Sequence, residues 1–186
     1  MKIIIACEFS GRVRDAFAKL GHDVISCDLL PTEQPGKHYQ GYVEDLLKEK
    51  WDMLIGFPDC TFRCNSGVRW LINNPVRLEQ LRQADLFFNM LLNQNIPKIC
   101  LENPIKHKYS TVPMYSQIIQ PWMFGDNEQK ATCLWLKGLP NLIPDIKVKP
   151  LDCRQSIHTM SPGKDRGHLR SITFRGVANA MAEQWG

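Results

Sequence analysis

Two short segments carry side chains that could act together in covalent catalysis. Cys60 lies in the loop 56–61, Gly-Phe-Pro-Asp-Cys-Thr, directly after an apolar run, and Glu102 begins Glu-Asn-Pro after another apolar run. A thiolate near cations is a nucleophile, and a buried carboxyl whose pKa is raised can donate a proton. Most cysteines are small buried hydrophobic residues, but this polar loop is an unusual place for one. We therefore predict that Cys60 is a nucleophile and Glu102 a positioned acid.

Two further features could hold a cofactor. Ser10-Gly11 precedes a helical pattern, so a ligand could approach the backbone N–H groups of a helix N-terminus there. Asp28 ends a strand-like run, where an acid suits the two hydroxyls of a ribose. A glycine-bearing turn after a first strand is common, however, and Asp28 could equally be a solvated strand-end residue. These two features alone leave nucleoside binding and an ordinary turn both open.

Basic side chains gather in three stretches that suit contact with phosphates, and aromatic residues beside them suit base stacking. The basic residues are Arg63 and Arg69, then Lys98, Lys106, His107 and Lys108, then those of residues 147–175, with Trp70, Tyr109 and Trp122 nearby. The formal net charge is only +4, from 23 Lys and Arg against 19 Asp and Glu. A solvated basic surface explains this composition as well as nucleic acid binding does.

Zinc binding is another interpretation of the cysteines. Cys60 and Cys64, with Cys133, Cys153 or His158, would supply enough ligands. The sequence has one C-x3-C pair and no second close pair, so the spacing disfavours zinc and we predict no metal site. The seven cysteines are odd in number and spread through apolar segments, which favours a reducing compartment and a cytoplasmic location.

The elements that must position these residues alternate between strands and helices. Apolar runs predict strands at 2–7, 23–28, 51–57, 99–101 and 132–136, and helical spacing predicts helices at 12–20, 75–95 and 174–185. This order predicts an α/β domain with a mainly parallel sheet and helices on both faces. Ligands of such sheets bind beyond the carboxyl ends of the strands, where all the candidate residues named above are expected.

The length of 186 residues predicts a single domain with its own core, with 44% hydrophobic and 23% charged residues. The apolar run at the N-terminus is too short for a signal peptide, and no run approaches a membrane span, so we expect no membrane contact. Residues 138–170 lose periodicity and gather prolines and basic residues, which predicts an extended loop region.

Together the motifs resemble those of a cytosine-5 DNA methyltransferase of the short kind found in phages and prophages. Phe9-Ser10-Gly11 resembles the first S-adenosylmethionine motif of that family, and Asp28 matches its ribose-binding acid. The Cys60 loop resembles the catalytic G-x-P-P-C-Q loop, and residues 102–104 resemble its E-N-V or E-N-P motif. Residues 130–136 and 176–181 look like the late motifs near the target base and the cofactor.

The resemblance implies a Rossmann-like class I methyltransferase sandwich, S-adenosylmethionine as cofactor and DNA as partner. It implies methyl transfer to carbon 5 of cytosine through a covalent Cys60 adduct, with Glu102 contacting the base. It further implies cofactor-binding roles for Phe9, Ser10, Gly11, Asp28, Asp45, Pro58 and Asn179, and substrate-binding roles for Arg63, Asn65, Ser66, Asn103, Lys130 and Thr132.

Three positions depart from the family pattern. Tyr42 stands where the family has the Asp that touches adenine, and we expect Asp45 to take over that role. Asp59 replaces the second proline of the catalytic loop and should raise the pKa of the neighbouring thiol unless Arg63 offsets it. The Q-x-R-x-R motif is not visible, with Gln129-Lys130 as a partial counterpart.

These departures motivate a second hypothesis: a catalytically weak or inactive methyltransferase-fold protein that binds a nucleotide, a nucleic acid or a host protein. A third keeps the enzyme but gives it free nucleotide or single-stranded DNA as substrate.

Family members typically carry a separate target-recognition domain before their last motif. In this sequence only residues 138–170 occupy that place. We therefore expect one catalytic domain over residues 1–186 with low sequence specificity, a short recognition loop, or help from a second chain in a homodimer or from a recognition partner. A phage-encoded enzyme of this kind would act in the cytoplasm of its bacterial host.

Overall fold

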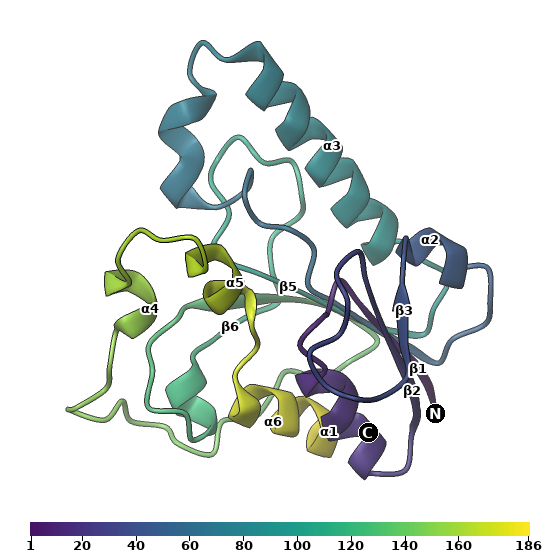
Figure 1. Cartoon of the computed structure of the whole chain (residues 1–186). Helices are drawn as coiled ribbons and strands as arrows, with labels where there is room; N and C mark the ends of the chain where they lie inside the picture. Colours follow the sequence, from purple (N-terminus) through teal and green to yellow (C-terminus); the bar gives the residue numbers. More distant parts are fainter.

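A seven-stranded sheet organises the chain in the computed structural model, which describes residues 1–186 except for the side chain of His158 (Figure 1). The strand order is β3-β2-β1-β4-β5-β7-β6. Neighbours from β3 to β5 are parallel, whereas β7 is antiparallel to both β5 and β6. The strands are β1 Lys2–Ala6, β2 Asp23–Asp28, β3 His38–Gln40, β4 Met53–Gly56, β5 Lys98–Asn103, β6 Gln117–Ile119 and β7 Thr132–Lys137.

This topology is the Rossmann-like class I methyltransferase sandwich, so the predicted fold class is confirmed. Its first five strands share the 3-2-1-4-5 order of dinucleotide-binding folds. The reversed β7 was not predicted. Its direction follows from the connection after β5, which runs through the edge strand β6 and the short helix η2 (Pro121–Phe124) rather than through a single crossover helix.

Helices cover both faces of the sheet (Figure 1). Helices α1 (Arg12–Lys19) and α6 (Arg175–Trp185) pack on one face, and α3 (Pro75–Leu92) packs on the other. Along β1, Ile3 and Ile5 join the core under α1 and α6, while Ile4 and Ala6 join the core under α3. Burial on both faces explains why the strand reads as a continuous apolar run.

Helix α3 extends beyond the sheet at its N-terminal end (Figure 1). Pro75 occupies its first turn, and the Asn74 side chain accepts the Arg77 N–H at 3.0 Å, which caps the helix. Leu81 and Phe88 are buried, as the helical spacing predicted, but Leu78 on the same predicted face is 46% exposed. The expectation for Leu78 was wrong because this end of the helix has no sheet beneath it.

Several short elements carry no periodic signal and were not predicted. Strand β3 lies within the expected loop 31–40, and β6 was missed altogether. The expected loop region 138–170 contains α4 (Ser156–Thr159) and part of α5 (Arg166–Ser171). The remaining short helices are α2 (Val43–Leu46) and η1 (Asn65–Leu71). Each is too short to bury a repeating apolar face, so tertiary contacts decide its conformation.

Three further features hold for the described residues. None of the helices is both long enough and apolar enough to cross a membrane. Within that same part of the chain, no group of three or more His, Cys, Asp or Glu residues is arranged to hold a metal ion. All seven cysteines are free thiols.

Candidate active site

The carboxyl ends of four neighbouring strands bring the predicted segments to one rim of the sheet. In the register of the sheet, Ala6 of β1 pairs with Gly56 of β4, and Gly56 pairs with Leu101 of β5. The residues that directly follow Ala6, Gly56 and Leu101 therefore lie at the same height along the strands. Glu102 is one of these residues. Glu102 lies within β5, one residue before its end, rather than after the strand.

Glu102 lines a hollow of about 290 Å³ together with Lys130 and Thr132, which sequence analysis placed near the substrate. Burial raises the pKa of Glu102, while the charge of Lys130 and a hydrogen bond with Thr132 oppose this shift. The Lys130 ammonium also donates to the Arg170 carbonyl at 2.9 Å. A carboxyl with a raised pKa can hold a proton near neutral pH and give it to a ligand.

Cys60 lies one turn of chain before a second cysteine, Cys64, whose backbone N–H donates to the Cys60 carbonyl at 3.1 Å. A hydrogen bond between the two thiols lowers the pKa of Cys64 and raises that of Cys60. Cys64 Sγ also lies 3.0 Å from Ser66 Oγ, a contact that further lowers its pKa. The charges of Glu102 and Asp59 further raise the pKa of Cys60. A negative charge on this pair therefore rests on Cys64.

Arg63 holds the cysteine loop from inside the protein. Its side chain is 2% exposed and donates to the carbonyls of Asp59 and Ala84, each at 2.6 Å, and to Asn103 Oδ1 at 3.1 Å. The Asn103 amide in turn donates to the Pro58 carbonyl at 2.7 Å. The substrate-binding roles predicted for Arg63 and Asn103 stay predictions; in the structure their polar groups fix the loop against β5.

A second hollow, of about 270 Å³, lies at the end of β1, where the cofactor was expected. Phe9 and Ser10 line it together with Phe57, and Thr173 lines both this hollow and the one at Glu102. The ring of His168 in α5 stacks on Phe9 at 4.7 Å. The contribution of residues 171–173 to this hollow was not predicted, because these residues follow an irregular stretch of sequence that carries no motif.

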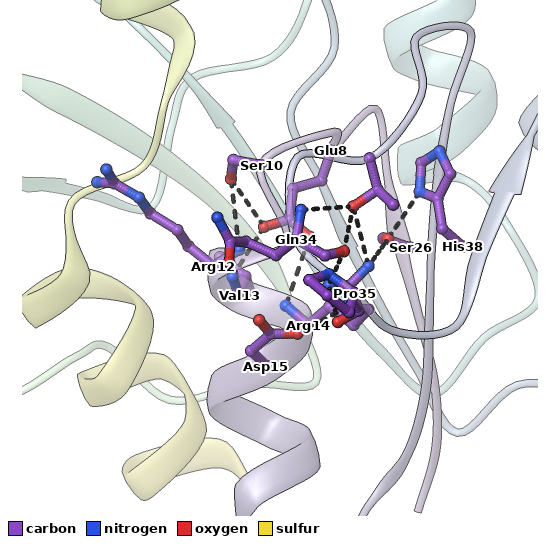
Figure 2. A network of polar contacts seen from close by, with 11 residues as sticks. Glu8, Ser10, Arg12, Val13, Arg14, Asp15, Ser26, Gln34, Pro35 and His38 are labelled. Carbon is purple, nitrogen blue, oxygen red and sulfur yellow. Dashed lines mark hydrogen bonds and ion pairs between the residues drawn. The ribbon is translucent and has the colours of Figure 1, made fainter.

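Glu8, which sequence analysis did not single out, occupies the N-terminus of α1 (Figure 2). Its carboxylate accepts the N–H groups of Val13 at 2.8 Å and Arg14 at 3.4 Å, and the Ser10 hydroxyl at 3.2 Å. Burial raises the pKa of Glu8, and these hydrogen bonds oppose the shift. The N–H groups of Val13 and Arg14 are therefore not open to a cofactor. The sequence signal that could have identified Glu8 is its position as an acid just before the Ser10-Gly11 start of a helix.

Among the described residues, Arg14 has the largest fully buried side chain, which lies beneath the turn at Ser10-Gly11 (Figure 2). Its guanidinium donates to Ser26 Oγ at 3.2 Å, to Thr32 Oγ1 at 3.1 Å and to the carbonyls of Gln34 and Pro35 at 3.0 and 3.1 Å. Gly11 has φ +72°, and a Cβ there would lie 2.4 Å from the Arg14 guanidinium. The fold therefore requires glycine at this turn whichever ligand binds.

The remaining predicted site residues are dispersed. Asp28 ends β2 and accepts the Leu30 N–H at 2.9 Å. Asp45 accepts the Tyr39 hydroxyl and pairs with Lys48, both at 3.1 Å. Three further predicted residues are exposed and line neither hollow: Asn65 and Ser66 at the start of η1, and Asn179 on α6.

The fold is that of an α/β protein with the Rossmann-like class I methyltransferase topology. No family model matches the chain, and no curated protein matches it in sequence. Its fold is similar to that of a prophage-encoded E. coli protein described as a DNA modification methyltransferase, with 14% identity, a TM-score of 0.47, and coverage of 72% of this chain and 45% of that one.

The methyltransferase EhMeth of Entamoeba histolytica is also similar, with 15% identity, a TM-score of 0.48, and coverage of 87% of this chain and 60% of that one. The chain thus spans about half the length of these two proteins. At these identities and scores the likenesses carry no information about the reaction.

Proposed function

We propose that this protein transfers a methyl group from S-adenosylmethionine to carbon 5 of cytosine in DNA. The observation that carries the proposal is the juxtaposition of the Cys60 loop and Glu102 at the carboxyl ends of β4 and β5, where the charge of Glu102 raises the pKa of Cys60. A nucleophilic thiol and a carboxyl able to hold a proton are the two groups that activation of a cytosine ring requires. The motif resemblance supports the same reaction.

The residues around the second hollow fit the cofactor in part. Asp28, at the end of β2, would hold the ribose hydroxyls, and the aromatic residues Phe9 and Phe57 line the hollow. The buried carboxyl of Glu8 also lines this hollow, and in its ionised form it would add negative charge near a ligand that carries a sulfonium and an ammonium group. When bound, S-adenosylmethionine supplies an electrophilic methyl group.

The chemistry of the protein's own residues begins at the thiol pair. As the Cys60 sulfur adds to carbon 6 of cytosine, its proton passes to the neighbouring Cys64 thiolate. Glu102 donates a hydrogen bond or its proton to N3, which makes carbon 5 nucleophilic toward the methyl group. Loss of the carbon 5 proton to solvent, return of the N3 proton to Glu102 and expulsion of the Cys60 thiolate restore the ring, and Cys64 returns the proton to Cys60. A duplex substrate would have to flip its cytosine out of the stack first.

The test is the substitution Cys60→Ser, with Cys153→Ser as a matched control because Cys153 is also a partly exposed thiol. Cys60→Ser is expected to lower methyl transfer to cytosine-containing DNA by roughly 10³-fold or more. DNA containing 5-fluorocytosine should form a covalent adduct with the wild type and with Cys153→Ser, because fluorine cannot leave as a proton does. Folded wild-type protein that gives neither turnover nor adduct would overturn the proposal.

The alternative is a methyltransferase-fold protein without turnover, which binds a nucleotide, a nucleic acid or a host protein. Two observations favour it: Tyr42, at the expected adenine-binding position, is 66% exposed, and Asp45 is held by Tyr39 and Lys48. Isothermal calorimetry with S-adenosylmethionine separates the two. Binding together with turnover supports the enzyme, whereas binding of nucleic acid without any turnover supports the alternative.

A further inference from the structure

Two exposed aromatic residues flank the loop that carries Cys60 and Cys64, and each lies beside a cation. Trp70 is 57% exposed, and the Arg69 guanidinium lies 4.7 Å from its ring centroid. Tyr109 is 47% exposed, and the Lys108 ammonium lies 5.2 Å from its ring centroid. An exposed aromatic ring beside a cation presents a flat apolar face and a positive charge at the same place.

Both aromatic residues belong to segments anchored to the cysteine loop. Trp70 lies in η1, which begins directly after Cys64 and, with the start of α3, projects beyond the sheet (Figure 1). The segment that carries Tyr109 is joined to the loop by an antiparallel bridge between Cys64 and Lys106. The His107 N–H also donates into the loop at 3.0 Å, and its ring lies 5.9 Å from that of Tyr109. The two platforms are therefore positioned relative to the proposed nucleophile.

The charge of these segments has one sign. Residues 60–78 contain three arginines and no Asp or Glu, and residues 103–125 contain two lysines, one histidine and no Asp or Glu. The acids that face them are Asp59, which is exposed and bonded by Thr61, Asp85, which is buried under Ser110 and Thr111, and Glu79, which pairs with Arg82 at 2.7 Å. The surface is complementary to a polyanion that also carries flat apolar groups.

We infer that Trp70 and Tyr109 are stacking platforms for unpaired bases of a DNA strand that is led to Cys60, an inference that rests on the proposed function. Arg69 and Lys108 contact the phosphates on either side of the stacked bases. Bases inside a duplex have their faces covered by their neighbours, so these rings select an unpaired segment. Because every base has a π-face, such contacts hold DNA without reading its sequence.

The protein carries its own reporter for this contact. Of the five tryptophans, all within the described residues, only Trp70 is exposed; the other four are at most 9% exposed. An oligothymidylate of about twelve nucleotides, a length that can span both platforms, is titrated into the wild type without cofactor. We expect it to quench the fluorescence of Trp70 and to protect it from collisional quenching by iodide.

Affinity is measured in parallel by the fluorescence anisotropy of the labelled oligothymidylate. Trp70→Ala and Tyr109→Ala should each weaken binding about tenfold, and Trp70→Phe, which keeps a ring, should bind nearly as well as the wild type. Leu20→Ala removes an exposed apolar side chain at the end of α1 and should leave affinity unchanged. Equal affinity of Trp70→Ala, Tyr109→Ala and wild type would overturn the inference, as would tighter binding of a duplex or of oligouridylate.

Thymidylate contains no cytosine, so this experiment does not depend on the proposed reaction. Binding that requires both rings, in a protein that gives no methyl transfer and no 5-fluorocytosine adduct, would refute the proposed function and leave the stacking platforms standing. Methyl transfer to duplex DNA by a protein whose affinity for oligothymidylate depends on neither ring would refute the stacking platforms and support the proposed function.

Discussion

Two polar clusters lie at the same rim of the sheet and differ in what their polar groups bind. Around Glu8 and Arg14, the side chains form hydrogen bonds with a helix start, with Ser26 and with the loop after β2 (Figure 2). Around Cys60 and Glu102, the thiols and the carboxyl lie beside hollows or exposed loops and have shifted pKa values. The first cluster stabilises the fold, and the second keeps reactive groups available.

The two clusters also differ in what a buried arginine does in each of them. Arg14 and Arg63 are both buried arginines, and both bind backbone carbonyls of a loop. Arg14 fixes a loop that carries no reactive group, whereas Arg63 fixes the loop that carries Cys60. Burial of a charged side chain therefore identifies a positioning residue, and only the loop that it holds shows whether the position serves chemistry.

After Cys60→Ser, the largest effect is expected at Glu102. Glu102→Gln should lower methyl transfer by roughly 10²- to 10⁴-fold, because the amide cannot give a proton to the base. The folding stability at neutral pH should not fall, since the substitution removes a buried charge whose pKa burial raises. Single-turnover rates and urea unfolding measure the two quantities. An active Glu102→Gln enzyme would remove Glu102 from the reactive cluster.

Arg14→Met should give the largest loss of stability, about 2 to 4 kcal/mol, because it leaves buried carbonyl and hydroxyl groups without their donor. Arg12→Met is the matched control; it removes a single hydrogen bond, to the Thr173 carbonyl at 2.9 Å. Urea unfolding midpoints give the comparison. Equal stability of the two variants would contradict the structural role of the Glu8–Arg14 cluster.

Thiol reactivity should distinguish the two cysteines of the loop. Since the pKa of Cys64 is lowered by its hydrogen bonds with Cys60 and Ser66, iodoacetamide at neutral pH should alkylate Cys64 before Cys60. In Cys64→Ala, Cys60 loses the neighbour that raises its pKa most, so its own alkylation should begin at lower pH than in the wild type. Peptide mapping by mass spectrometry locates the label. Preferential labelling of Cys60 in the wild type would refute the proton-accepting role of Cys64.

Glu8 and Glu102 should share a pH effect, because burial raises the pKa of both above 4.5. A carboxyl whose pKa is higher in the folded state stabilises the fold when protonated, and this contribution is lost as pH rises through the folded pKa. As pH rises from 5 to 8, Glu8→Gln and Glu102→Gln should therefore each gain stability relative to the wild type. The lower limit lies about half a pKa unit above the pKa of glutamate in the unfolded chain.

The two variants should nevertheless differ in absolute stability. At pH 8, Glu8→Gln should be less stable than Glu102→Gln by about 1 kcal/mol, because an amide offers one acceptor oxygen where the Glu8 carboxylate binds three donors. Urea unfolding at the two pH values tests both statements. A Glu8→Gln protein as stable as Glu102→Gln would show that the hydrogen bonds to α1 contribute little.

The sequence by itself determined the central strands, the long helices and the order of the reactive motifs. Strands buried on both faces must be apolar throughout, and helix α3 needs an apolar stripe, so β1, β4 and most of α3 were readable. The adjacency of the Cys60 loop and Glu102 followed from the rule that parallel strands end at one rim.

Only the tertiary structure decided which polar groups remain available. Arg63, Asn103 and the start of α1 read as ligand-binding features, but their hydrogen-bonding capacity is used by Asp59, Pro58 and Glu8. The second thiol beside Cys60 and the contribution of residues 171–173 depend on loops whose conformation has no sequence period. A residue type states what a side chain can bind, whereas its neighbours in space determine what it does bind, because buried polar groups must find partners.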